Sequence, residues 1–161
     1  MSYFLYIFCR SQSPITRQVI TEFIQDGVYF DEDPRYEPPE QFGENQGDNW
    51  DSFKLYYQDN KKPVTFYRNA QDESLRNHIE DAVDDVEMFG KASKEQSLIR
   101  HLEACQQVIT VEIDRSDLTE DAGDSINNLE RYLAKKYGGV IYAPDGGFYD
   151  HNLRLILSLH K

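Results

Sequence analysis

The amino-acid sequence predicts an α/β (α+β) fold, a single two-layer domain in which helices lie mainly on one face of a mixed sheet of about six strands. The length of 161 residues fits one domain, residues 1–161. Hydrophobic residues make up 39% of the chain, which is enough for a substantial core. Segments in which every second residue is apolar alternate with segments of helical period, as in repeated βαβ units.

The first part of the chain predicts a strand, a helix and a second strand. Residues 3–9 are continuously apolar, which is typical of a central strand that is buried on both faces. Ser13 and Pro14 predict the N-cap and the first residue of a helix, and Gly27 predicts its end. The short apolar run at 28–30 predicts a second strand.

The middle of the chain predicts a hairpin followed by two helices. Residues 53–58 alternate between apolar and polar, and residues 63–68 return as the partner strand. An apolar stripe over 75–86 predicts the first of the two helices. Ser93 and Gln96 have the spacing of a capping box and predict the start of the second.

The last third continues the alternation. Gly138 predicts a left-handed helix end, and Pro-Asp-Gly-Gly at 144–147 predicts a turn in which Gly146 takes a positive φ. The glycine-rich stretch 137–150 is therefore interpreted as turns, because a phosphate-binding loop needs a preceding strand, a following helix and usually a lysine. The predicted elements are a strand at 108–113, a helix over 126–133, strands at 140–142 and 148–149, and a strand at 153–159 whose four leucines face the core.

Charge and composition argue against several classes of protein. The net charge is -12 and the isoelectric point is near 4.7, so we expect no binding to nucleic acid or to anionic membranes. No apolar run approaches the roughly 18 residues that a membrane span requires. Cys9 and Cys105 are expected to be reduced core thiols because no secretion signal is recognised, and this predicts a cytoplasmic location.

The segment 31–52 is the most unusual part of the sequence. It holds eight acidic residues and one basic residue, a balance of -7, together with three prolines and two glycines. A loop of this length is commonly functional, and its spaced aromatic residues suit a surface that meets a basic protein. In the alternative interpretation it is a solvated excursion whose aromatic rings pin it to the sheet. The predicted partner-binding residues are Asp31, Asp33, Tyr36, Glu37, Phe42 and Trp50.

Catalytic patterns are scarce. The histidines are not paired at zinc-ligand spacing, and no acidic stretch has the spacing of a calcium loop. We therefore assign no catalytic residue, no metal ligand and no cofactor. An alternative function is metal-assisted hydrolysis by carboxylates assembled in space, with Asp31, Asp33, Glu112 and Asp114 as the candidates. It requires that these four side chains converge.

The favoured hypothesis is a non-catalytic acidic binding protein that engages a basic protein partner. An acidic face on the helix over 75–86 would contribute together with the segment 31–52. In size, charge and layout the chain resembles small bacterial α/β proteins, among them acidic immunity proteins that neutralise toxins. The resemblance involves no specific motif, and it implies an immunity-like or inhibitor-like function.

Overall fold

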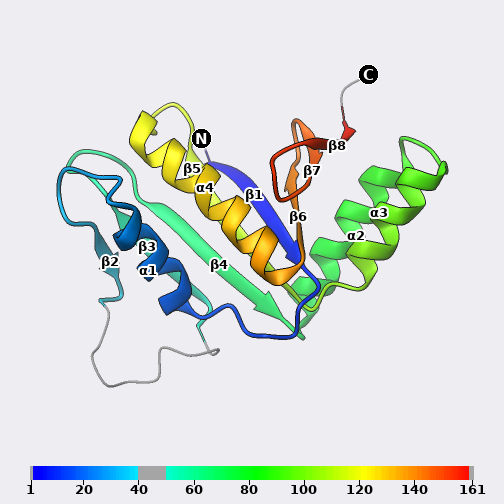
Figure 1. Cartoon of the computed structure of the whole chain (residues 1–161), viewed down its shortest axis with the longest axis horizontal. Helices are drawn as coiled ribbons and strands as arrows, with labels where there is room; N and C mark the ends of the chain where they lie inside the picture. The colour runs from blue at the N-terminus through cyan, green and yellow to red at the C-terminus, as the bar shows by residue number, and fades with distance from the viewer. Residues whose placement is uncertain (1, 40–49, 160–161) are drawn as a thin grey trace.

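The computed structural model describes residues 2–39 and 50–159, which form one eight-stranded sheet and four helices (Figure 1). Neighbouring strands are all antiparallel, in the order β2-β3-β4-β5-β1-β6-β7-β8. The predicted α+β class is confirmed, but the sheet has eight strands rather than about six and is not mixed. The strands are β1 (Ser2–Cys9), β2 (Arg35–Glu37), β3 (Ser52–Tyr56), β4 (Val64–Ala70), β5 (Gln107–Asp114), β6 (Gly139–Ala143), β7 (Gly147–Tyr149) and β8 (Leu155–Ser158), and the helices are α1 (Arg17–Gly27), α2 (Glu73–Glu87), α3 (Ser93–Glu103) and α4 (Glu120–Tyr137).

β1 lies at the centre of the sheet, as its apolar sequence predicts. It pairs with β5 on one side and β6 on the other, and Ile7 lies opposite both Ile109 and Ile141. Ile7 and its neighbour Phe8 are both completely buried. Because successive side chains of a strand point to opposite faces, these two residues belong to two separate cores.

Two βαβ units are interleaved in the centre of the sheet. One unit is β1–α1–β4, with β2 and β3 inserted between α1 and β4, and the other is β5–α4–β6. The strand order places β5 between β1 and β4 and β1 between β5 and β6. This is the split βαβ arrangement of ferredoxin-like sheets. The parallel strands of each unit are therefore never neighbours, which is why the mixed sheet expected from repeated βαβ units is wrong.

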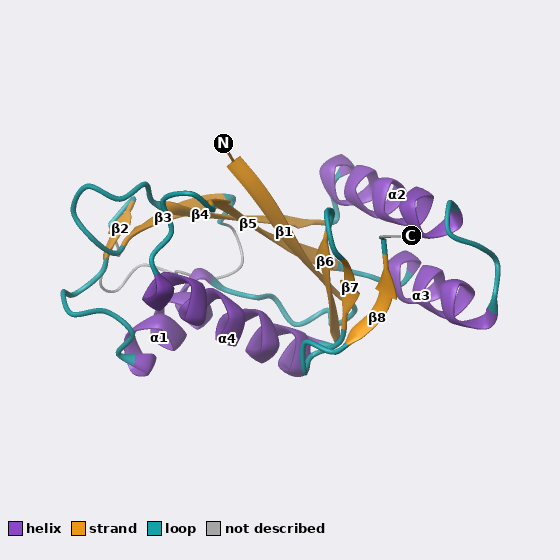
Figure 2. Cartoon of the chain, turned by 90° about the horizontal axis from the view of Figure 1, so that it is seen from above, coloured by secondary structure: helices purple, strands orange, loops and turns teal. Residues whose placement is uncertain are grey.

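The helices cover both faces of the sheet rather than mainly one. α1 and α4 pack over a core that contains Ile7 and Ile109, and α2 and α3 pack over a second core that contains Phe8 and Val108. Figure 2 shows the two helix pairs apart from each other, with α1 and α4 side by side below the sheet. Both faces need cover because the central strands are apolar on both sides.

α1 begins later than predicted. Its N-cap is Thr16, whose Oγ1 accepts a hydrogen bond from the backbone N–H of Val19 at 3.2 Å. Ser13 and Pro14, the predicted start, belong to the preceding loop. The side chain of Gln107 binds the loop backbone on both sides of Pro14, so this stretch cannot enter the helix.

The ends of two helices also differ from the prediction. Gly27 is the last residue of α1, but the residue in left-handed conformation is Val28, with φ 48°. The predicted strand at 28–30 is absent, and the chain continues as a loop toward β2. The N-cap of α3 is Ala92 without a side-chain hydrogen bond, so the capping box predicted from Ser93 is wrong.

The glycine-rich stretch 137–150 joins α4, β6 and β7 through turns, as predicted. Gly138 caps α4 with φ 64°, and the N–H of Gly146 donates to the carbonyl oxygen of Ala143 at 2.9 Å. The residue with positive φ in this hairpin turn is Gly147, at 153°, rather than Gly146. A Cβ at Gly147 would overlap the carbonyl oxygen of Leu157 in the neighbouring strand.

The alternation predicted for the last strand holds only in part. Leu157 is buried against Phe148, but Leu155 is 55% exposed, and Leu153 lies before the strand with φ 60°. The pairing between β7 and β8 contains a register shift next to Tyr149, and a shift of this kind breaks a strict inward pattern.

Replacing Gly147 by alanine is expected to lower the free energy of unfolding by about 2–4 kcal/mol, because the new Cβ is strained and meets backbone. Gly146→Ala is the control, since its Cβ meets first the hydroxyl end of Tyr149, at 2.9 Å, which can move. Chemical denaturation of the two variants measures the difference. Equal losses in both would show that the strand-edge clash is not the cause.

Candidate functional site

Part of the predicted long loop is a strand. Residues 35–37 form β2, which pairs with β3 so that Tyr36 lies opposite Leu55. Phe42 lies outside the described residues. The segment 31–52 therefore contains the edge of the sheet, flanked by Pro34 and Pro38.

The two described aromatic residues of the segment face the body of the protein. Trp50 donates from Nε1 to the carbonyl oxygen of Ile15 at 2.9 Å, and its ring centroid lies 5.2 Å from that of Phe53. Tyr36 approaches the same Phe53 ring edge-on at 6.0 Å. This packing agrees with the alternative in which the rings pin the segment to the sheet. A role for Tyr36 or Trp50 in contacting a partner stays a prediction.

The structure does not bring the four carboxylates of the hydrolase alternative together. Asp31 and Asp33 precede β2, and the strands β3 and β4 separate β2 from the strand of Glu112 and Asp114 by about 14 Å. Within residues 2–39 and 50–159, no group of three or more His, Cys, Asp or Glu could hold a metal ion.

Both carboxylates on β5 already have partners. Glu112 accepts hydrogen bonds of 2.6 Å from Ser2 and Tyr67, and these bonds lower its pKa. Asp114 lies 2.7 Å from the ammonium group of Lys62, which holds the pKa of its carboxyl far below the usual range. Ser2 lies on β1 and Tyr67 on β4, so Glu112 joins β5 to both neighbouring strands, and Asp114 joins it to the loop before β4.

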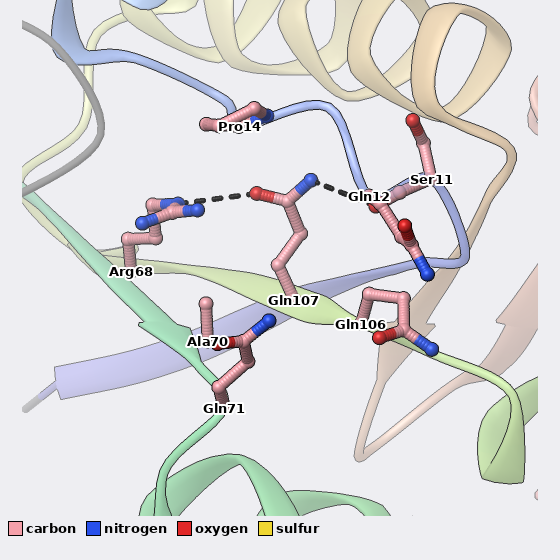
Figure 3. Close-up of a pocket in the computed structure, with 8 residues that line it drawn as sticks. All are labelled: Ser11, Gln12, Pro14, Arg68, Ala70, Gln71, Gln106 and Gln107. Atoms are coloured by element: carbon pink, nitrogen blue, oxygen red, sulfur yellow. Dashed lines mark hydrogen bonds between the residues drawn. The ribbon is translucent and has the colours of Figure 1, made fainter.

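A polar pocket of about 250 Å³ lies where the ends of β1, β4 and β5 meet (Figure 3). Arg68 is the one charged residue of its lining, and the glutamine amides of Gln71, Gln106 and Gln107 surround the hollow. Only Gln107 is deeply buried, with 1% of its surface exposed.

The buried amide of Gln107 uses its full hydrogen-bonding capacity. Its nitrogen donates to the carbonyl oxygens of Ser11 at 3.1 Å and Ser13 at 2.7 Å. Its oxygen accepts from the N–H of Ile15 and from Nε of Arg68, both at 3.1 Å. Since an amide has two donors and two acceptor positions, this side chain has none left for a ligand. Gln107 is a clamp that holds the β1–α1 loop against the sheet, and nothing in its local sequence pattern indicated this.

A different surface combines exposure, strain and charge at the C-terminal end of α1. Val28 is 81% exposed and has a left-handed backbone, which is a genuine outlier for a β-branched residue. A pocket of about 430 Å³ lies beside it, lined in part by Tyr29, Phe30, Glu32 and Asp33. We call Asp26, Val28, Asp31, Glu32 and Asp33 the acidic turn surface; all five are exposed.

The electrostatic potential of the acidic turn surface is negative for two reasons. α1, which is described in full, has no basic residue in its last turn, so the partial negative charge of its C-terminus is not offset there. Asp26 lies in that last turn, where a carboxylate costs the helix stability. Asp31 and Asp33 were predicted from the sequence, whereas Val28 was missed because Val-Tyr-Phe after a helix is typical of a buried strand.

Glu130 is a second charge anomaly, on the buried side of α4. Only 3% of its surface is exposed, and its Oε1 has no hydrogen-bond partner among the described residues. Burial raises the pKa of this carboxyl to about 8. The side chain is therefore protonated in the folded protein at neutral pH.

Three comparisons, with models of known protein families, with curated proteins and with solved structures, found no match to this chain. None of the described helices is long and apolar enough to cross a membrane. The candidate site therefore depends on its own geometry.

Gln107→Ala is expected to lower the free energy of unfolding by about 2–4 kcal/mol, because the N–H of Ile15 and two loop carbonyls lose their buried partner. Gln106→Ala is the matched control, since that side chain makes one hydrogen bond, of 3.3 Å, to Ala104. It is expected to change stability by less than about 0.5 kcal/mol. Similar losses in the two variants would contradict the assignment of Gln107 as the clamp.

Glu130→Gln is expected to remove a pH dependence of stability. The folded pKa of Glu130, about 8, lies above the ordinary value of 4.5, so its contribution is complete below pH 4.5 and is lost as the pH rises through 8. The variant should be roughly 5 kcal/mol more stable than the parent at about pH 9 and equal to it at about pH 4.5. Denaturation at several pH values measures this, and parallel curves for the two proteins would overturn it.

Proposed function

We propose that this protein is a non-catalytic binding protein that engages a basic protein partner, in the manner of an immunity protein or an inhibitor. The acidic turn surface, with Glu37 beyond it on β2, is the region of first contact. One observation carries the proposal: Val28 is apolar, exposed and in a strained conformation, and acids surround it.

The acids serve to steer the partner. Asp31, Asp33 and Glu37 are exposed on the segment that carries a balance of -7, and the end of α1 adds its own negative potential. Clustered charge of one sign raises the association rate with a partner of opposite charge and loses this effect at high salt. Exposed charges of this kind change the rate of association more than the rate of dissociation.

Val28 serves to hold the partner after contact. Both its exposure and its left-handed backbone are unfavourable in the free protein, and residues held in such conformations cluster at functional sites. A small apolar centre inside a polar rim is the usual organisation of an interface hot spot. Packing among residues 2–39 and 50–159 does not account for an exposed valine at this position.

The acidic face of α2 is a second, separate surface. Glu80, Asp81 and Asp84 are exposed there, while Asp85 accepts a hydrogen bond from the hydroxyl of Tyr142. α2 and α1 belong to the cores on opposite faces of the sheet, so one small partner cannot cover both. α2 therefore supplies the matched control. A cytoplasmic setting is part of the same proposal, because both cysteines are free and buried. The bacterial setting rests on the resemblance in size, charge and layout alone.

The experiment begins with capture of partners on the immobilised full chain from native lysate, repeated at high salt. The triple variant Asp31→Asn, Asp33→Asn, Glu37→Gln is expected to slow association with the recovered basic partner roughly tenfold at low salt and to flatten its salt dependence. The control removes the same number of charges from α2 by Glu80→Gln, Asp81→Asn and Asp84→Asn. An equal effect of the two triple variants would reject the acidic turn surface as the contact site.

The second arm of the experiment tests Val28. Val28→Asn should stabilise the free protein by roughly 1 kcal/mol, because asparagine tolerates the left-handed conformation, and should speed dissociation of the complex. Met88→Asn is the control, because Met88 is 80% exposed at the end of α2. If Val28→Asn leaves the dissociation rate unchanged, Val28 is not the anchor.

A further inference from the structure

A second hollow, of about 390 Å³, lies between α1 and α4 next to the acidic turn surface. It shares Tyr29 with the pocket beside Val28. Three of its lining residues are aromatic, Phe23, Tyr29 and Tyr132, and its charged residues are Glu22, Asp26 and Lys136. Rings together with carboxylates are the groups that bind organic cations in water.

The rings are held in place by packing. Phe23 stacks on Tyr132 with centroids 4.8 Å apart and 24° between the planes, and Tyr29 is tilted against Phe23 at 6.4 Å. The hydroxyl of Tyr29 accepts a hydrogen bond of 3.2 Å from Asn128. The ring of Tyr29 also lies so close to Gly27 that a Cβ there would overlap it. The ring of Tyr29 can therefore take this position only because residue 27 has no side chain. The three rings, which we call the ring wall, are held in place before any ligand binds.

A cation of the same chain, the ammonium group of Lys136, already lies against one ring of the hollow. The ammonium group of Lys136 donates to the hydroxyl of Tyr132 at 3.2 Å and lies 5.5 Å from the centroid of that ring. This hydrogen bond is the main cause of a raised pKa for Lys136. The lysine side chain is exposed at the rim, so a cation from outside can replace it.

The acids lie one turn apart on α1. Asp26 is four residues after Glu22, so both carboxylates lie on the same side of the helix. Glu22 accepts a hydrogen bond of 2.6 Å from Gln18, which orients it. The hollow therefore offers two negative charges at the edge of a ring wall.

The chain itself shows which cation suits rings and acids in this combination. Arg115 lies with its guanidinium carbon 3.7 Å from the ring centroid of Tyr3 and with NH1 2.7 Å from the carboxylate of Asp145. A planar guanidinium can stack on a ring and bind a carboxylate at the same time, whereas an ammonium is a point charge. We infer that the hollow between α1 and α4 receives an arginine side chain of the basic partner. That the arginine comes from a protein partner rests on the proposed function. That the hollow binds an arginine side chain does not depend on it.

The test is an NMR titration of the isotope-labelled full chain with N-acetyl-arginine methylamide, the lysine analogue and the uncharged citrulline analogue. The arginine probe is expected to shift the signals of Asp26, Tyr29 and Tyr132, the lysine probe to bind more weakly and the citrulline probe to leave them in place. Equal shifts with citrulline, tighter binding of lysine, or arginine shifts confined to other residues would each overturn the inference.

Variants make the test specific. Asp26→Asn is expected to lower the affinity for the arginine probe about fivefold. Lys136→Met is expected to raise that affinity by a similar factor, because the competing cation is gone. Asp84→Asn, on the opposite face of the sheet, is the control and should leave the affinity unchanged. If Asp26→Asn and Asp84→Asn weaken binding equally, only the net charge acts and the hollow is not the site.

The two proposals fail in distinguishable ways. If the probe does not bind while the triple variant at Asp31, Asp33 and Glu37 still slows the partner, the arginine hollow is wrong and the proposed function stands. If the probe binds at Tyr29 and Tyr132 but no charge variant alters the partner kinetics, the hollow stands and the proposed function is wrong.

Discussion

The four hydrogen bonds of the Gln107 side chain are the constraint on which the arrangement of α1 depends. Three of them tie the loop after the central strand β1 to the first residue of β5, and the fourth joins that residue to Arg68 of β4, all at 3.1 Å or less. Ile15 packs into the core, but the rest of this loop is mainly polar, and its backbone groups need hydrogen-bond partners where they are buried. The clamp keeps Ser11, Ser13 and Ile15 in the loop, and α1 begins after them, at Arg17.

The interleaved βαβ units explain why α1 and α4 are neighbours. Each of these helices crosses over one strand of the other unit, so both lie on the same face and pack against each other. Their shared edge is where Phe23 of α1 stacks on Tyr132 of α4. The insertion of α2 and α3 between β4 and β5 closes the other face. The ring wall is thus a product of the topology, which brings together Phe23 and Tyr132 from positions more than a hundred residues apart.

The end of α1 combines several features that lower the stability of the free protein. A valine takes a left-handed backbone, an aspartate lies at the negative end of a helix, and an apolar side chain faces water. Each has a cost of roughly 0.3–3 kcal/mol, a large part of the stability of a small domain. Their coincidence at one turn, beside two hollows, distinguishes this surface from the acidic face of α2, which has regular helical backbone.

The sequence by itself determined the class of the fold and most of its elements. The hydrophobic pattern within a segment indicates which of its faces are buried, and it does so whichever element packs against that segment. Examples are the continuous apolar residues at 3–9, the alternation at 53–58 and the helical stripe at 75–86. The acidity of the segment 31–52 was equally visible. Only the tertiary structure decided the antiparallel order of the strands, the helices on both faces, the clamp of Gln107 and the exposure of Val28. These depend on contacts between distant segments: a local pattern shows that a residue such as Val28 is apolar, but whether another element covers it is decided by the path of the rest of the chain.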